Sequence, residues 1–311
     1  TMLYTVTFNP AIDYLMHLDR LTPGSILRSE RENAFFGGKG INVSQVLQQL
    51  GVENTALGFI AGFTGEALEN GLSAAGVRTE LIRLPHGMTR INVKLRADTE
   101  TDINGRGPAV DGASLDRLLD KIRALTADDT LVLAGSVPGD LPRDIYDRIL
   151  CCIEGRGVRV AVDTSGAPLR HCLRHAPFLL KPNTEELSEL LGETIGTPEE
   201  AAVGARRVQA MGAKNVLVSM GGIGAVLADE SGICRFCPAV RGRAVDTTGA
   251  GDSMLAGFLA ALSRGEGPVQ ALRLGTAAGA ATAFTEGLAD RAAIEQQLSA
   301  VCAASKKERI L

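Results

Sequence analysis

The stretch "AVDTTGAGDSMLAGFLAAL", residues 244–262, decides the fold of this chain. Residues 244–245 predict the end of a strand, and residues 253–262 predict a helix whose apolar side chains recur on one face. The turn between them, Gly249-Ala250-Gly251, has almost no side chains, so its backbone N–H groups can approach a ligand closely. Because the start of a helix offers unpaired N–H donors and a partial positive charge, this turn predicts a site for an anion.

Asp252 follows the turn at the point where that anion would lie. A carboxylate beside an anion is unfavourable unless the chemistry of the site requires it. A simpler interpretation is a strand-to-helix connection with no ligand, because Asp and Ser are favoured at helix starts and Gly is favoured in turns. Which of these two interpretations applies depends on the motifs found in the rest of the chain.

The composition of the 311 residues is that of an ordinary globular protein, with 45% hydrophobic and 22% charged residues and a net charge of −4. No block of Lys and Arg stands out and Trp is absent, so we expect no nucleic-acid partner. No apolar run approaches the ~20 residues of a membrane span, so we expect no membrane association. No basic segment followed by an apolar run opens the chain, which favours a cytoplasmic protein.

Six cysteines are present, and without a secretory signal they are expected to be reduced thiols. Cys234 and Cys237 form a C-x-x-C, and His171 and His175 are spaced by four residues, but each pair lacks a second pair of metal ligands. In a strand, residues three apart point to opposite faces, so the two cysteines would be a poor chelate. We expect all four side chains to be structural.

Apolar strand-like runs alternate with amphipathic helical segments along the chain. The runs are residues 3–8, 131–134, 158–162, 178–180 and 216–218, and helical segments include 115–125, 145–154 and 199–211. This alternation predicts an α/β fold, a mostly parallel sheet with helices on both faces, in a single domain over residues 1–311. Residues 12–36 and 89–103 alternate apolar with polar side chains instead, which predicts a small inserted β lid or an extension of the main sheet.

Polar side chains follow most of the predicted strands. Ligands of open α/β sheets bind beyond the carboxyl ends of the strands, so these residues predict one shared cleft. They are Asn9, Asp13, Ser136, Asp163, Lys181, Asn183 and Ser219. Neither a P-loop nor a G-x-G-x-x-G motif occurs, but three glycine clusters do: "GGKGIN" (37–42), "SMGGIG" (219–224) and "TTGAGD" (247–252).

In these motifs the sequence resembles the PfkB family of carbohydrate kinases, which have the ribokinase-like fold. "GGKGIN" is similar to the N-terminal signature of that family, and "DTTGAGD" from Asp246 is similar to its C-terminal signature. The order and spacing of the intermediate motifs also match, and the resemblance covers essentially the whole chain. It implies an ATP-dependent phosphotransferase that acts on an alcohol group, with Mg²⁺ as cofactor.

The resemblance implies that Asp252 is the catalytic base and that Gly249, Ala250 and Gly251 supply N–H groups to the transferring phosphoryl group. A carboxylate at a helix N-terminus is expected to have a lowered pKa and to be a weak base. Phosphoryl transfer tolerates a weak base, because its loose transition state needs an oriented nucleophile more than early proton removal.

At the nucleotide end, "KPNTEE" resembles the N-x-x-E element of the family. This resemblance implies that Asn183 and Glu186 hold Mg²⁺, through water, and that Lys181 contacts phosphate. ATP contacts are likewise implied for Ser219, Gly221, Gly224 and Thr248. Taken alone, "NTEE" is a helix start with acidic residues in its first turn.

At the acceptor end, Asp13 and Asn42 are expected to bind sugar hydroxyls, in a site that Gly37, Gly38 and Ser136 complete. Lys39, Arg90 and Arg28 are expected to clamp a phosphate on the acceptor, because Arg offers bidentate contacts to phosphate. For Arg28 the alternative is a solvated face of the lid.

A phosphorylated acceptor points to the 1-phosphofructokinase and tagatose-6-phosphate kinase branch. "TRINVK" (89–94) and "TDING" (101–105) favour fructose 1-phosphate as substrate, with tagatose 6-phosphate as the alternative. The two could fit one clamp in reversed orientations, because a ketohexofuranose carries a hydroxymethyl group at C1 and at C6. Two other classes stay open: a non-catalytic sensing module and a kinase for a vitamin-type heterocycle. Lid sheets of this family often pair between subunits, which implies a homodimer.

Overall fold

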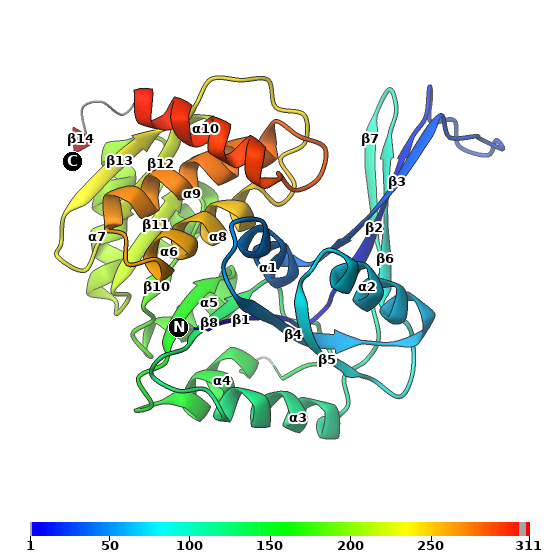
Figure 1. Ribbon diagram of the computed structural model, residues 1–311, viewed down its shortest axis with the longest axis horizontal. Coiled ribbons are helices and arrows are strands. Elements are labelled where there is room, and N and C mark those ends of the chain that lie inside the picture. Colours follow the sequence, from blue (N-terminus) through cyan, green and yellow to red (C-terminus); the bar gives the residue numbers. More distant parts are fainter. Residues whose placement is uncertain (1, 143, 305–308) are drawn as a thin grey trace.

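A ten-stranded sheet runs through the computed structural model, which describes residues 2–142, 144–304 and 309–311 (Figure 1). Its strand order is β14-β13-β12-β11-β10-β9-β8-β1-β4-β5. Neighbours from β11 to β5 pair in parallel, and neighbours from β11 to β14 pair antiparallel. The strands are β1 (Leu3–Thr7), β4 (Asn54–Ile60), β5 (Arg78–Arg83), β8 (Thr130–Ala134), β9 (Arg159–Asp163), β10 (Leu179–Leu180), β11 (Asn215–Ser219), β12 (Gly224–Ala228), β13 (Cys234–Pro238) and β14 (Arg309–Ile310).

Helices cover both faces of this sheet, which is why its strands are apolar on both sides. The helices are α1 (Lys39–Gln49), α2 (Gly62–Ala74), α3 (Gly112–Arg123), α4 (Ile145–Ile153), α5 (Gly166–Leu173), α6 (Thr184–Leu191), α7 (Pro198–Ala210), α8 (Ala250–Ser263), α9 (Pro268–Ala283) and α10 (Arg291–Ala304). Side chains of α3 to α7 form one core with the sheet, and those of α1 and α8 to α10 form a second core on the other face. The predicted fold class is therefore confirmed.

A second, four-stranded sheet, called the small sheet below, projects from the body of the molecule (Figure 1). Its order is β3-β2-β6-β7, and its strands are β2 (Ala11–His17), β3 (Arg31–Gly37), β6 (Arg90–Arg96) and β7 (Glu100–Asn104). They come from the two segments of alternating polarity, and they form a sheet of their own instead of extending the main one. Because side chains alternate across a strand, Asp13, Asn92 and Lys94 share one face of the small sheet.

Two local expectations have different outcomes. Residues 253–262 lie within α8, as predicted. Residues 244–245 are not a strand: the Val245 N–H donates to the Ala283 carbonyl at the end of α9, so this segment packs on a helix and borders the cavity described below.

Cys234, Cys237 and His175 have structural contacts, and His171 is exposed on the surface. Cys234 and Cys237 pack into opposite cores on the two faces of β13, which agrees with their expected structural role. His175 pairs with Asp147, at 2.6 Å between Nε2 and Oδ1. In the part of the chain that the structure describes, no helix is long and apolar enough to cross a bilayer.

Candidate active site

A cavity of about 990 Å³ opens where the carboxyl ends of the parallel strands meet the small sheet. It brings together most of the residues singled out in the sequence. Those that line it are Asp13, Gly38, Lys39, Asn42, Arg90, Lys181, Asn183, Glu186, Ser219, Gly221, Gly224, Thr248, Gly249, Ala250, Gly251 and Asp252. Three glycine clusters and several charged side chains line this one cavity, as the prediction of a shared cleft requires.

The start of α8 faces this cavity without a cap. Gly249 occupies the N-cap position with φ 78, and no described side chain accepts a hydrogen bond from the first turn. A Cβ on Gly249 would lie 2.7 Å from Leu288, so both the left-handed backbone and the close packing require glycine there. A Cβ on Gly251 would lie 3.3 Å from the Lys181 ammonium. The Ala250 N–H donates to the Thr247 carbonyl at 3.2 Å, and the other N–H groups of this turn form, with Lys181, a cradle suited to an anion.

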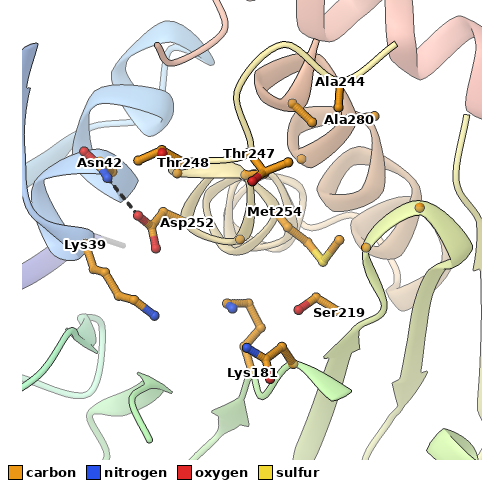
Figure 2. Close-up of a pocket in the computed structure, with 18 of the residues that line it drawn as sticks. Lys39, Asn42, Lys181, Ser219, Ala244, Thr247, Thr248, Asp252, Met254 and Ala280 are labelled. Atoms are coloured by element: carbon orange, nitrogen blue, oxygen red, sulfur yellow. Dashed lines mark hydrogen bonds between the residues drawn. The ribbon is translucent and has the colours of Figure 1, made fainter. Parts of the chain in front are cut away.

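Asp252 is buried beside that cradle, with only 6% of its surface exposed. The Asn42 side-chain amide donates to its Oδ2 at 2.8 Å, as Figure 2 shows. Burial, together with the nearby Asp163 charge, raises the pKa of Asp252 to about 6, against the pull of Lys39, Asn42 and Lys181. The expected lowering of this pKa is wrong, because loss of water outweighs the field of the helix N-terminus. A carboxylate with this pKa is a better base than the sequence indicated.

Asp163 was predicted only as one of the polar strand ends of the cleft, and no chemical role was assigned to it. It is buried at the end of β9 and pairs with Lys39 at 3.2 Å and with Lys181 at 3.1 Å. Burial by itself would raise the pKa of Asp163, but Lys181 and Lys39 lower it. The lysines and Asp252 gather around the same space in Figure 2. The contact of Asp163 with Lys39 exists only because the fold places β9 beside the start of α1. In the sequence, the position of Asp163 at a polar strand end was therefore the one sign of its place in the site.

One side of the cavity is formed by residues of the small sheet. Asn92 donates from its side-chain amide to Asp13 Oδ1 at 2.8 Å. The buried Nε of Arg90 has no hydrogen-bond partner among the described residues. Burial lowers the pKa of Arg90, and the Asp13 charge opposes that shift. Arg90 itself lines the cavity, so its guanidinium can offer N–H donors to an anion there.

Four of the predicted acceptor-site residues lie elsewhere than expected. Arg28 is exposed in the loop between β2 and β3, and Ser136 is exposed after the turn at Gly135 (φ 101), and neither borders the cavity. Gly37 lies behind the wall, next to Asp13 and Asn42. Lys39 does line the cavity, but its ammonium is paired with Asp163 on the side of Asp252. Of the three residues predicted to clamp a phosphate, Arg90 is the one that lines the cavity from the small sheet.

The opposite end of the cavity is a set of tight turns. Asn183 caps α6 in a capping box: its side chain accepts from the Glu186 N–H, and Glu186 accepts from the Asn183 N–H. Asn183 also bridges to Ser219 at the end of β11. Gly224 follows, where a Cβ would lie 2.1 Å from the Cys237 carbonyl. The helix-cap interpretation of "NTEE" is thus correct, and Glu186 lines the cavity as well.

An apolar wall closes this end, and no sequence motif predicted it. It is formed by Val240, Met254, Ala280, Ala283 and Phe284, from the loop before α8 and from α8 and α9. Met254 and Ala280 lie along this end of the cavity in Figure 2. A flat apolar slot beside the anion cradle suits the base of a nucleotide.

Comparisons with known proteins agree with this geometry. Residues 6–294 match the model of the pfkB family of carbohydrate kinases. A 1-phosphofructokinase of Bacillus subtilis is 41% identical over 300 residues, covering 96% of this chain and 98% of that protein. A D-tagatose-1-phosphate kinase of Bacillus licheniformis is 34% identical over 301 residues, with 96% and 98% covered. Phosphofructokinase-2 from Escherichia coli, in complex with substrates and products, superposes with a TM-score of 0.90 at 26% identity, covering 96% of this chain and 99% of that one. The chain belongs to the pfkB family of carbohydrate kinases.

Proposed function

We propose that this kinase transfers the γ-phosphoryl group of ATP to the free hydroxymethyl oxygen of a ketohexose monophosphate, and that fructose 1-phosphate is the acceptor. The observation that carries this proposal is the convergence of the start of α8, the buried Asp252 and the Arg90 guanidinium on one cavity. In the reaction the C6 oxygen forms a bond to phosphorus, the bond to the bridging oxygen of ADP breaks, and fructose 1,6-bisphosphate results.

The proposed roles of the catalytic residues follow from their contacts. Asp252 takes the proton of the acceptor hydroxyl, and Asn42 holds its carboxylate in place. The N–H groups of Gly249, Ala250 and Gly251 bind the transferring phosphoryl oxygens, where charge builds up in the transition state. Lys181 lies over Gly251 and Lys39 lies close to Asp252, so both ammonium groups can neutralise that charge.

At the nucleotide end, Lys181, Asn183, Ser219, Gly221, Gly224 and Thr248 are proposed to hold the phosphates and ribose of ATP. Val240, Ala280 and Phe284 are proposed to cover the base. A kinase that consumes ATP and a phosphorylated sugar is expected to work in the cytoplasm.

Two observations favour fructose 1-phosphate over the alternatives. The two curated relatives described above are named for a ketohexose 1-phosphate, which favours that class over tagatose 6-phosphate. The acceptor end is lined by Asp13, Arg90, Asn92 and Lys94, and a vitamin-type heterocycle would need an apolar stacking slot there. A sensing module is disfavoured because the base and the anion turn are both intact.

A coupled assay of ADP release across acceptors tests the proposal. We expect fructose 1-phosphate to be the best substrate, tagatose 6-phosphate a weaker one and free fructose negligible, because Arg90 provides a donor for phosphate. Fructose 6-phosphate is included as the isomer with the phosphate at the other end, and the product is identified by phosphorus NMR. Equal rates with free and phosphorylated sugars would contradict the proposal.

Mg²⁺ is the proposed cofactor, held through water by Asn183 and Glu186. The capping box uses Oε2 of Glu186, and the residue lines the cavity, so Oε1 is available for a metal-bound water. Carboxylate, amide and water oxygens are the ligands that Mg²⁺ prefers. When bound, the ion would neutralise charge on the phosphates of ATP.

Glu186→Gln is expected to raise the Mg²⁺ concentration for half-maximal rate by about tenfold, since a second-sphere carboxylate typically affects metal affinity by this order. The measurement is the initial rate against Mg²⁺ at saturating substrates. Glu200→Gln is the matched control, because Glu200 has the same capping-box position on α7 but lies outside the cavity wall. An unchanged metal dependence in Glu186→Gln would leave Glu186 with its capping role alone.

We further propose that the whole chain acts as one kinase domain, with the small sheet as a lid that pairs with a second copy in a homodimer. On the face opposite Asp13, Ile103 is 58% exposed. Light scattering of the purified protein, repeated on Ile103→Lys, tests the dimer: the substitution is expected to shift it to monomer. A monomeric wild-type protein would contradict the pairing.

A further inference from the structure

The small sheet carries a cation, Lys94, that neither the motifs nor the comparisons assign to the site. Lys94 lies two residues beyond Asn92 on β6, on the same face as Asp13, and it lines the cavity. Its ammonium is 3.5 Å from Asp13 Oδ2, and the two side chains are 11% and 18% exposed. A lysine this close to a carboxylate at a cavity wall is a largely desolvated ion pair.

The partners of Asp13 divide its two oxygens between them. Oδ1 accepts from the Asn92 amide at 2.8 Å, and the Gly105 N–H donates to Asn92 Oδ1, which fixes the orientation of that amide. Oδ2 faces Lys94. The carboxylate is thus held from two sides by groups on one strand, and its remaining lone pairs can accept from a ligand in the cavity.

Lys94 pairs with Asp13 although a second carboxylate, Asp102, lies on the neighbouring strand. Asp102 lies directly across from Lys94 in the register of β6 and β7, which makes it the closest alternative by topology. Asp102 instead accepts from Arg96 at 2.8 Å. The Lys94 ammonium therefore pairs with Asp13, which is also the carboxylate that accepts a hydrogen bond from Asn92.

A partly buried ion pair of this kind is weak as a source of stability, because desolvation of the two charges offsets much of their attraction. Its physical effect is to hold a charge in one position. We propose that Lys94 is a positioning residue of the acceptor site: its ammonium holds the Asp13 carboxylate in the orientation that faces the hydroxyl groups of the sugar. The inference rests on the proposed function, in which Asp13 binds those hydroxyls.

The test is a double-mutant cycle on the full-length kinase, with kcat and KM measured separately for fructose 1-phosphate and for ATP. Lys94→Met is expected to lower kcat/KM for fructose 1-phosphate at least tenfold, while KM for ATP stays within about twofold. In an Asp13→Asn background the same substitution is expected to cost less than about twofold, because Lys94 acts through Asp13. Lys94→Arg, which keeps the charge, is expected to recover part of the loss.

Lys121→Met is the matched control, because Lys121 also pairs with a carboxylate, Glu80, but lies outside the cavity wall. Lys94→Gln is made in parallel, so that the test can still be carried out if the Lys94→Met variant folds poorly. Wild-type kinetics in both Lys94→Met and Lys94→Gln would overturn the inference. A loss of kcat/KM in the Asp13→Asn background as large as that in the wild-type background would overturn it as well. Failure of the wild-type enzyme to use fructose 1-phosphate would instead overturn the proposed function, so the two failures are distinguishable.

Discussion

Asp252→Asn is expected to lower kcat by about 10³-fold or more with little change in ATP affinity, because an amide cannot take the proton of the acceptor hydroxyl. The substitution preserves shape and the contact with Asn42. The measurement is steady-state kinetics together with nucleotide binding by calorimetry. Asp111→Asn is the matched control, since Asp111 also lies at a helix start but caps α3 away from the cavity. A variant that keeps most of its turnover would remove Asp252 from the catalytic role.

The raised pKa of Asp252 gives this prediction a pH dependence. The base must be ionised, so kcat/KM is expected to fall about tenfold per unit as the pH drops below about 6. The folded protein binds this proton more tightly than the unfolded chain does, so burial of Asp252 lowers the free energy of unfolding as the pH rises from about 4 through 6. Asp252→Asn is therefore expected to raise the free energy of unfolding at pH 7, by up to about 3 kcal/mol. A lower melting temperature in the inactive variant would indicate misfolding instead.

Arg90→Ala is expected to lower kcat/KM for fructose 1-phosphate by about 10- to 100-fold, because a hydrogen bond to a charged group contributes about 1.5–3 kcal/mol. Arg90 lines the cavity, so the substitution removes guanidinium donors from its wall. KM for ATP is expected to stay nearly constant, since Arg90 belongs to the small sheet and the nucleotide turns lie at the opposite end of the cavity.

The control for Arg90→Ala is Arg148→Ala, which removes an arginine from an exposed helical ion pair with Asp144. Arg90→Lys separates charge from geometry, because lysine keeps the charge but loses the bidentate fork. An Arg90→Ala enzyme that still prefers fructose 1-phosphate over free fructose by the wild-type ratio would exclude Arg90 from phosphate recognition.

Much of the fold could be predicted from local patterns. The buried strands and the amphipathic helices were found where apolar residues recur with the period of each element, as in α8 and β8. Residues 244–245 were wrongly predicted to end a strand, because Ala244 and Val245 are as apolar as strand residues. The place of Ala244 in the wall of the cavity explains its apolar side chain equally well. Elements rich in small residues, such as α9, gave no periodic signal strong enough to place them.

The sequence by itself determined the chemistry that depends on the backbone: a glycine turn leading into a helix presents N–H groups wherever it occurs, so the anion cradle and the adjacent Asp252 could be predicted. The tertiary structure alone decided the state and partners of the charges. Lys39 and Asp163 are 124 residues apart in sequence, and Asn42 and Asp252 are 210 apart, yet these contacts set which lysine faces the base and how basic it is. The same holds for Lys94 and Asp13, joined only by the pairing of β6 with β2. Burial and long-range electrostatic partners depend on how the strands are ordered, and no local spacing of residues encodes that order.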